Sequence, residues 1–341
     1  MYRVAIIGCG AVAESGHLPA LMRHSQFHAV ALCDTRLERA KRLAGQAGAA
    51  ATYTDWRALL DGEAVDAAVL ALPPEVSPDV AIACLERSIP VLDEKPLAST
   101  IEDGRRMAHT ITRCGGVFQV GFVLRYGACV EMIRQLARKI GTPARYHVAI
   151  YDEKLDRADT EHFTRIQGFL RDSSAMTHEG SHVIDYAVLW NSSPWKRIRA
   201  TATRTEDDLA GPNVWQASVD LADSSTLEIE IGWLLPELPP CTVSVEGPDG
   251  RVELSLSTGR GSWWIAGASG ALALPPMAPE WDRQYDVFAE AIEYGEARVA
   301  TVADGLRALE VSTACERSAR TGEAIVCDER NSAAMPREDS E

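Results

Sequence analysis

The sequence predicts an α/β protein with two parts: an N-terminal doubly wound parallel sheet, and a C-terminal α+β domain with a large, mostly antiparallel open sheet. Three observations favour this fold class. Apolar strand-like runs alternate with helix-like runs over the first third of the chain, which is typical of a parallel sheet covered on both faces. Longer stretches of β-type alternation follow residue 122. The length of 341 residues, with 46% hydrophobic content, is enough for two packed cores.

A turn that contains two glycines follows directly after the first apolar run. Residues Tyr2 to Ile7 predict a buried strand, and the next residues permit a tight turn and close approach of the backbone to a pyrophosphate at a helix N-terminus. Ala13 occupies the position of the third small residue in this pattern. We therefore expect a dinucleotide to contact Gly8, Gly10, Ala11, Val12 and Ala13.

A carboxylate stands at the position expected for ribose recognition. The second apolar run, Ala29 to Cys33, ends in Asp34, about twenty residues beyond the glycine turn. A carboxylate there accepts hydrogen bonds from the adenosine ribose diol, which favours NAD over NADP. Arg36 and Arg39 lie close by, and a guanidinium can pair with a 2'-phosphate, so NADP remains possible.

The alternation of helices and strands continues to residue 121. The expected elements are helices at 38–48, 76–87 and 101–113 and strands at 66–72, 90–93 and 117–121. The carboxyl ends of parallel strands face one ligand crevice. Leu72 and Pro73, at the end of one strand, and Glu94-Lys95-Pro96, at the end of another, should therefore lie at the same edge as the glycine turn, and we assign Leu72, Pro73 and Glu94 to the cofactor.

Lys95 is the strongest catalytic candidate in this edge. Moving a hydride from a secondary alcohol carbon requires that the hydroxyl proton leave as the carbonyl forms. A lysine beside the nicotinamide can hydrogen-bond the substrate oxygen and stabilise its alkoxide character. The placement of Lys95 at a strand end makes a merely solvated surface lysine the weaker interpretation.

The second part of the chain is expected to form a sheet and two late helices. The alternating runs are 145–151, 197–205, 215–221, 226–234 and 242–246, and residues 247–250 should form a hairpin turn. Apolar residues recur at helical spacing over 281–292, and Thr301 to Asp304 resembles a capping box. We expect domains at 1–121 and 122–330, with a polar tail at 331–341.

Composition restricts the class of partner. The formal charge of −15 argues against nucleic acid or an anionic membrane surface, and a small molecule is favoured. No apolar stretch approaches membrane-spanning length and no leader pattern opens the chain, so we expect a cytoplasmic location. The eight cysteines lie in apolar segments with no Cys-x-x-Cys pair, which indicates reduced core residues and no zinc site.

The chain resembles the glucose-fructose oxidoreductase, inositol dehydrogenase and rhizopine catabolism (Gfo/Idh/MocA) family over nearly its whole length. The order and spacing of several short stretches carry this resemblance: 8–13, 33–34 with 38–40, 73–74, 94–98, 121–122 with Arg125, 180–182 with Asp185, and 304–310. The resemblance implies an N-terminal Rossmann domain, a nicotinamide cofactor, a sugar, cyclitol or polyol substrate, and a homodimer or homotetramer formed through the C-terminal sheet. It also implies that the Lys95–Pro96 peptide bond is often cis.

The resemblance also implies further site residues, with two departures. Family members carry Asp-x-Gly-x-His where this chain has His178-Glu179-Gly180-Ser181-His182, so His182 would relay the proton and His178 replaces a carboxylate. His178 can polarise Lys95 or the substrate, act as a base, or signal a changed reaction. Arg125 and Tyr126 would help to line the substrate cleft, while Ser77 replaces the family's usual histidine.

Several alternatives remain open at this point. Residues 178–182 also spell His-Glu-x-x-His, a zinc protease pattern, although Gly180 is a poor residue for a helix interior. Spacing alone does not exclude a downstream third ligand such as Glu206. No tyrosine precedes a lysine by four residues, as short-chain dehydrogenases require. The two remaining functional alternatives are a non-redox enzyme that oxidises a glycoside transiently with bound NAD, and a catalytically silent regulatory protein. Trp263, Trp264 and Trp281 are expected in the core or in subunit contacts.

Overall fold

The computed structural model describes residues 1–48, 51–277, 279–295 and 299–327. The predicted tail at 331–341 lies outside these residues. By contact the chain divides into two compact units, one of residues 1–127 and 277–309 and the other of residues 128–276 and 310–341. The predicted domain boundary at residue 121 remains a prediction, because a grouping by contact does not test it.

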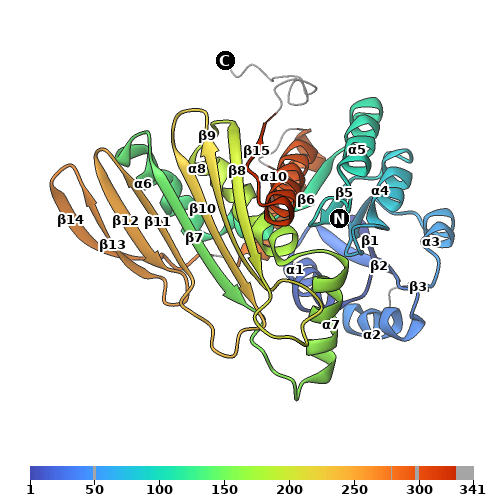
Figure 1. Cartoon of the computed structure of the whole chain (residues 1–341). Helices are drawn as coiled ribbons and strands as arrows, with labels where there is room; N and C mark the ends of the chain where they lie inside the picture. Colours follow the sequence, from blue (N-terminus) through green and yellow to red (C-terminus); the bar gives the residue numbers. More distant parts are fainter. Residues whose placement is uncertain (49–50, 278, 296–298, 328–341) are drawn as a thin grey trace. The chain divides into compact units, whose positions relative to one another are not determined.

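The first unit contains a six-stranded, wholly parallel sheet of order β3-β2-β1-β4-β5-β6 (Figure 1). The sequence of strands reverses direction between β1 and β4, which is where ligands bind in doubly wound sheets. The strands are β1 (Tyr2–Ile7), β2 (Phe27–Cys33), β3 (Ala51–Tyr53), β4 (Ala67–Leu70), β5 (Val91–Glu94) and β6 (Phe118–Gly121). This confirms the predicted parallel sheet.

Helices cover both faces of this sheet. They are the π-helical turn η1 (Ala13–His17), α1 (Leu18–Arg23), α2 (Leu37–Ala47), α3 (Trp56–Gly62), α4 (Ser77–Leu85), α5 (Ile101–Cys114), the 3₁₀ turn η2 (Val123–Tyr126) and α9 (Glu280–Tyr294). Helix α9 closes one face, because Tyr285 and Phe288 are fully buried in a core with Leu21, Phe27 and Leu32. This confirms the predicted helix and shows that Trp281 packs against the same core.

The second unit is built on a nine-stranded sheet of order β14-β13-β12-β11-β7-β10-β9-β8-β15, in which only β7 and β10 pair in parallel (Figure 1). The strands are β7 (Arg145–Asp152), β8 (Trp195–Thr203), β9 (Val214–Leu221), β10 (Thr226–Trp233), β11 (Thr242–Gly247), β12 (Gly250–Ser255), β13 (Arg260–Ile265), β14 (Ala268–Ala273) and β15 (Ile325–Val326). The mostly antiparallel sheet and the hairpin between β11 and β12 are confirmed.

The helices of the second unit are α6 (Ala128–Ile140), α7 (Thr160–Asp172), the π-helical turn η3 (Met176–Gly180) and α8 (Ser181–Trp190). Trp190 of α8 donates a hydrogen bond to the carbonyl of Val130 on α6 at 3.0 Å, and its ring stacks on Tyr146 of β7. These contacts place α6 and α8 on the buried face of the sheet. Trp264 is 46% exposed, so it is not the core residue that the sequence allowed.

Helix α10 (Val302–Thr321) begins in the first unit and ends in the second. The predicted capping box is present: the backbone N–H of Thr301 donates to Asp304 Oδ2 at 2.9 Å, and that of Asp304 donates to Thr301 Oγ1 at 3.3 Å. Within the described residues no helix is long and apolar enough to cross a membrane.

Candidate functional site

The glycine turn after β1 is shaped by two different steric demands. Gly8 has φ of +93°, and a Cβ there would lie 2.2 Å from the carbonyl oxygen of Ala71 at the end of β4, so only glycine is accommodated. At Gly10, by contrast, a Cβ would meet no heavy atom within 4 Å. Ala11 and Val12 are exposed, and Ala13 is fully buried. The turn is therefore packed on its inner side and open on its outer side, as a pyrophosphate-binding loop requires.

Asp34 is tied to this turn by backbone hydrogen bonds. Its Oδ2 accepts from the N–H of Cys9 at 2.9 Å, and its Oδ1 accepts from the N–H of Arg36 at 2.8 Å. Each oxygen keeps a second lone pair for a further donor. Arg39 is half-buried on the first turn of α2, and the N–H of Arg39 donates to the carbonyl of Arg36 at 2.9 Å. The two Asp34 oxygens can therefore still accept hydrogen bonds from the hydroxyl groups of an unphosphorylated adenosine ribose.

The segment after β4 lies against the same turn. Leu72 Cδ2 would be 3.3 Å from a Cβ at Gly8, and the carbonyl of Pro73 accepts the N–H groups of Val76 and Ser77. Both thiols near the turn are inert, since burial raises the pKa of Cys9 to about 12 and that of Cys33 to about 11. Leu72 and Pro73 thus lie at the carboxyl edge of the sheet, as predicted.

Glu94 ends β5, which lies between β4 and the edge strand β6, and Lys95 follows directly. Lys95 is half-buried and the Lys95–Pro96 peptide bond is cis, as the resemblance implies. Glu94 is only 8% exposed. Its Oε1 lies 3.0 Å from His17 Nε2, and its Oε2 accepts the N–H of Lys95 at 3.3 Å.

His17 is a residue that the sequence analysis missed. It is fully buried in η1, and its Nδ1 lies 3.1 Å from Tyr285 Oη on α9. These partners stand 77 and 268 residues away along the chain, so no local pattern connects them. The sequence did contain one signal that could have identified His17: it is a histidine in the first helical segment after the predicted dinucleotide turn, at a buried position.

Arg125 and Tyr126 lie in η2, directly after β6. The Arg125 guanidinium forms an ion pair with Asp304 at 3.2 Å and donates to the carbonyl of Val299 at 3.1 Å. Burial alone would raise the pKa of Asp304, but Arg125 and the backbone of Thr301 lower it below its ordinary value. Arg125 thereby joins η2 to the start of α10, and Tyr126 is buried beside it.

His178 and His182 lie in the second unit, on one continuous helical segment formed by η3 and α8. The His178 ring is half-buried, 4.7 Å from the Phe169 ring and 5.9 Å from that of Trp233. His182 is 5% exposed. Glu316 of α10 anchors this segment, because Ser174 Oγ and Thr177 Oγ1 donate to its Oε1 at 2.5 and 2.7 Å.

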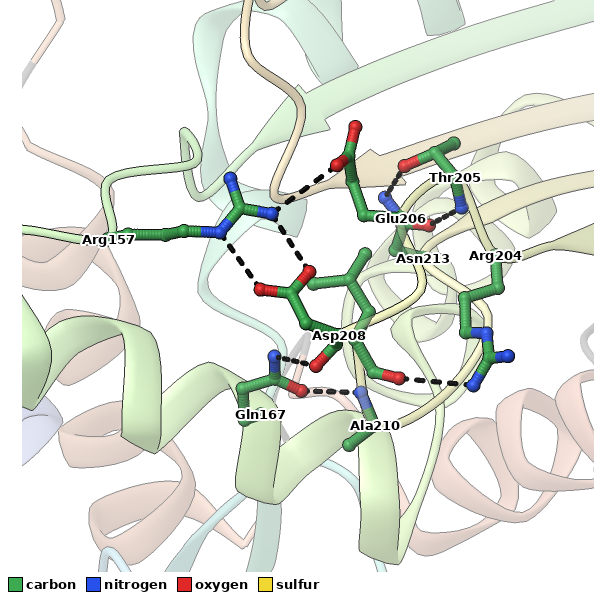
Figure 2. A network of polar contacts seen from close by, with 9 residues as sticks. Arg157, Gln167, Arg204, Thr205, Glu206, Asp208, Ala210 and Asn213 are labelled. Carbon is green, nitrogen blue, oxygen red and sulfur yellow. Dashed lines mark hydrogen bonds and ion pairs between the residues drawn. The ribbon is translucent and has the colours of Figure 1, made fainter.

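A polar network immobilises the loop between β8 and β9 against α7, which carries Phe169 (Figure 2). Arg157 pairs with Asp208 at 2.8 Å and with Glu206 at 3.4 Å. Gln167 of α7 accepts the N–H of Ala210 at 2.5 Å and donates to the carbonyl of Asp208 at 3.0 Å. Glu206, which spacing left open as a third zinc ligand, is thus part of an ion pair, and the described residues contain no group of three or more potential metal ligands.

The comparisons with known proteins agree with this geometry. Residues 2–122 match the model of the GFO_IDH_MocA family, described as an oxidoreductase family with an NAD-binding Rossmann fold. Inositol 2-dehydrogenase 2 of Saccharopolyspora erythraea is 29% identical over 345 residues, covering 94% of this chain and 93% of that protein. D-glucoside 3-dehydrogenase of Escherichia coli is 32% identical over 133 residues, covering 39% of this chain and 38% of that protein.

Among solved structures, an oxidoreductase from Agrobacterium radiobacter in complex with NAD+, L-tartaric acid and magnesium superimposes with a TM-score of 0.84 at 18% identity, covering 95% of this chain and 98% of that one. The likeness to that structure concerns the fold. The protein is therefore an oxidoreductase with an NAD-binding Rossmann unit. The match to the Gfo/Idh/MocA family model covers residues 2–122 of the chain.

Proposed function

We propose that this oxidoreductase transfers a hydride between NAD and a secondary hydroxyl or keto group of a sugar, cyclitol or related polyol, with Lys95 as the residue that handles the substrate proton. The observation that carries the proposal is the position of Lys95: it follows β5 directly, at the carboxyl edge that also carries the Gly8–Gly10 turn and Asp34. The names of the two relatives, dehydrogenases of an inositol and of a glucoside, support the substrate class.

The first unit has residues suited to hold the cofactor. The open turn at Gly10 to Val12 would take the pyrophosphate, Asp34 the adenosine ribose, and Leu72, Pro73 and Glu94 the nicotinamide half. When bound, the nicotinamide ring accepts or donates the hydride. The anchoring of Asp34 by two N–H groups supports NAD as the preferred dinucleotide, because the fixed carboxylate would repel a 2'-phosphate.

The chain's own residues would then move the proton. The Lys95 ammonium would donate a hydrogen bond to the substrate oxygen and stabilise negative charge on it. His182 would relay the proton, since an imidazole takes up and releases protons near neutral pH. His178 would contact the substrate in place of a carboxylate, and Arg125 and Tyr126 would help to bind it.

We also propose that the protein is a cytoplasmic homodimer or homotetramer that assembles through the large sheet. Ion pairs cross the more exposed face of this sheet, between Arg145 and Glu228 at 2.6 Å and between His147 and Glu230 at 3.3 Å. A half-buried polar face of this kind suits a subunit contact with fixed register. Light scattering of the purified protein tests the subunit number, and a monomer at micromolar concentration would refute the assembly.

The test of the reaction is the absorbance of reduced nicotinamide during a screen of sugars, cyclitols and sugar acids with NAD and NADP. We expect turnover by the wild type and a loss of about 10² to 10⁴-fold in kcat for Lys95→Ala. Lys139→Ala, at an exposed lysine on α6, is the matched control and should keep full activity. Bond cleavage in a glycoside without net NADH would instead support transient oxidation, and NAD binding without any turnover would support a regulatory protein.

A further inference from the structure

We propose that His17 and Tyr285 are positioning residues: through a chain of two buried hydrogen bonds they fix the Glu94 carboxylate and thereby the backbone at Lys95. This inference rests on the proposed role of Lys95 in the reaction. It adds His17 of η1 and Tyr285 of α9 to the residues that position Lys95. Neither of the two has to touch the cofactor or the substrate.

Both hydrogen bonds that link Tyr285, His17 and Glu94 have ordinary lengths. Tyr285 Oη lies 3.1 Å from His17 Nδ1, and His17 Nε2 lies 3.0 Å from Glu94 Oε1. His17 and Tyr285 are both 0% exposed. Both side chains are thus shielded from bulk water, so their polar atoms need hydrogen-bond partners inside the protein.

Packing fixes the plane of the imidazole ring. The Trp281 indole meets it edge-on, with ring centroids 4.8 Å apart and an interplanar angle of 77°. A Cβ at Gly16 would lie 2.5 Å from the Trp281 ring, so the glycine allows α9 to approach η1 this closely. The ring of His17 is thus held from α9 by two residues one helical turn apart, Trp281 and Tyr285.

The proton positions along the chain follow from its two ends. Complete burial, and next the charge on Glu94, raise the pKa of Tyr285 well above its ordinary value, so the phenol keeps its proton. We assign the ring proton of His17 to Nε2, so that the phenol donates to Nδ1 and Nε2 donates to Glu94 Oε1. One neutral tautomer of His17 satisfies both contacts, and both donors are directed toward the carboxylate.

The second carboxylate oxygen transmits the effect to Lys95. Glu94 Oε2 accepts the N–H of Lys95 at 3.3 Å, while Oε1 is bound to His17. A Cβ at Gly121, on the neighbouring strand β6, would lie 2.7 Å from Oε1, so the space for this carboxylate depends on a glycine. If His17 no longer donated, the buried carboxylate would turn toward another donor, and a shift of about 1 Å at a reacting group can cost about 10²-fold in rate.

The kinetic test compares Tyr285→Phe with Tyr146→Phe, a matched loss of a buried phenol in the other unit. We expect Tyr285→Phe to lower kcat roughly tenfold and to change the substrate KM less than about twofold. In a Glu94→Ala background the same replacement should change kcat less than about twofold, because the group on which it acts is gone. His17→Gln, whose amide can still donate to Glu94, should keep more activity than His17→Leu.

Three results would overturn the proposal: wild-type kcat in Tyr285→Phe, multiplication of the Tyr285→Phe and Glu94→Ala effects, or equal losses in both tyrosine variants. A purely structural role would lower the active fraction and the unfolding midpoint without a selective fall in kcat. Titration of bound NADH gives the active fraction, and urea unfolding gives the midpoint.

A readout without turnover separates this proposal from the proposed function. ¹⁵N NMR of histidine-labelled protein should show His17 neutral with its proton on Nε2, and Tyr285→Phe should change the Nδ1 shift. A proton on Nδ1 in the wild type, or an Nδ1 shift unchanged in Tyr285→Phe, contradicts the hydrogen-bond chain. Full activity of Lys95→Ala would contradict the role of Lys95, even where the NMR result shows that the chain exists.

Discussion

Asp93 and Glu94 are adjacent on β5, and their carboxyl groups have different hydrogen-bond partners. The strand alternates its side chains, so Glu94 faces His17 while Asp93 faces Ser77 at the start of α4. Ser77 Oγ donates a hydrogen bond to Asp93 Oδ1, and Oδ2 has no hydrogen-bond partner within the described residues. Burial first, and then the charge of Glu94, raise the pKa of Asp93 well above its ordinary value of 3.8. Ser77 thus has a structural partner in Asp93, at the position where the resemblance led us to expect a histidine.

This raised pKa predicts how stability changes with pH. The native state keeps the Asp93 proton while the unfolded chain releases it near pH 3.8, so this contribution to stability is lost as pH rises from 3.8 through the raised value. Asp93→Asn lacks the titration and should gain stability relative to wild type over that range, by at most about 1.4 kcal/mol per pH unit. Urea unfolding between about pH 4 and pH 8 measures the difference. Asp61→Asn, at an exposed aspartate, is the control, and a difference for Asp93→Asn that does not vary with pH would contradict the assignment.

His178 predicts a distinct pH dependence of the reaction. An ordinary imidazole titrates near pH 6.5 and an ordinary aspartate near 3.9, so the two side chains are charged in different ranges and with opposite signs. We expect the acid limb of the kcat/KM profile to move to lower pH in His178→Asp, with activity retained. Steady-state rates across the pH range measure this, and superimposable profiles of wild type and variant would remove His178 from the titrating groups.

At the scale of secondary structure, each of the two π-helical turns contains a histidine of interest. His17 ends η1, and His178 lies within η3. A π turn contains one more residue than an α turn, so it rotates the following side chains relative to the helical face that a period of 3.6 predicts. Such turns occur often at functional sites. The direction of both rings therefore depends on local backbone geometry as well as on spacing.

The close approach of α9 to η1 predicts opposite effects for two glycine replacements. A Cβ at Gly16 would lie 2.5 to 2.7 Å from three ring atoms of Trp281, and the ring has little room because it also packs on His17. Gly16→Ala should therefore destabilise the protein by about 1–3 kcal/mol. Gly45 is exposed within α2 and a Cβ there would meet nothing within 4 Å, so Gly45→Ala should stabilise by about 0.5–1 kcal/mol. Urea midpoints measure both changes, and equal effects at the two sites would contradict the steric argument.

The elements were predictable where the signal is local. The strand that ends at Ile7, the helix that follows Thr100, the hairpin at 247–250 and the cap at Thr301 all follow from neighbouring residues, and the structure confirms them. The carboxyl-edge positions of Gly8, Asp34 and Lys95 follow from the rule for parallel sheets. The π turns were not predictable, because hydrophobic period cannot detect one inserted residue. The partners of His17 were not predictable either, because they depend on which distant segment covers the sheet.

At the scale of the whole molecule, the first unit is discontinuous in sequence. Its core combines Val4, Ile6 and Phe27 with Tyr285 and Phe288, which come from the last fifth of the chain. Residues 277–309 supply α9, which carries Tyr285, the buried partner of His17. They also supply Asp304, the ion-pair partner of Arg125. The cofactor-binding unit is therefore complete only when residues 277–309 have been synthesised.

This arrangement makes the predicted domain boundary at residue 121 directly testable. A fragment of residues 1–127 would leave exposed the apolar face that Tyr285, Phe288 and Ala289 cover, and fully buried aromatic side chains contribute about 1.5–3 kcal/mol each to a net stability of only about 5–15 kcal/mol. We expect the fragment to unfold without a cooperative transition and to bind NADH weakly. A fusion of residues 1–127 to 277–309 through a flexible linker should restore both properties, whereas a fusion that carries Tyr285→Asp and Phe288→Asp should not. Cooperative unfolding of residues 1–127 alone, with NADH affinity equal to that of the whole protein, would show instead that the first 127 residues form an independent domain and that α9 is an accessory to it.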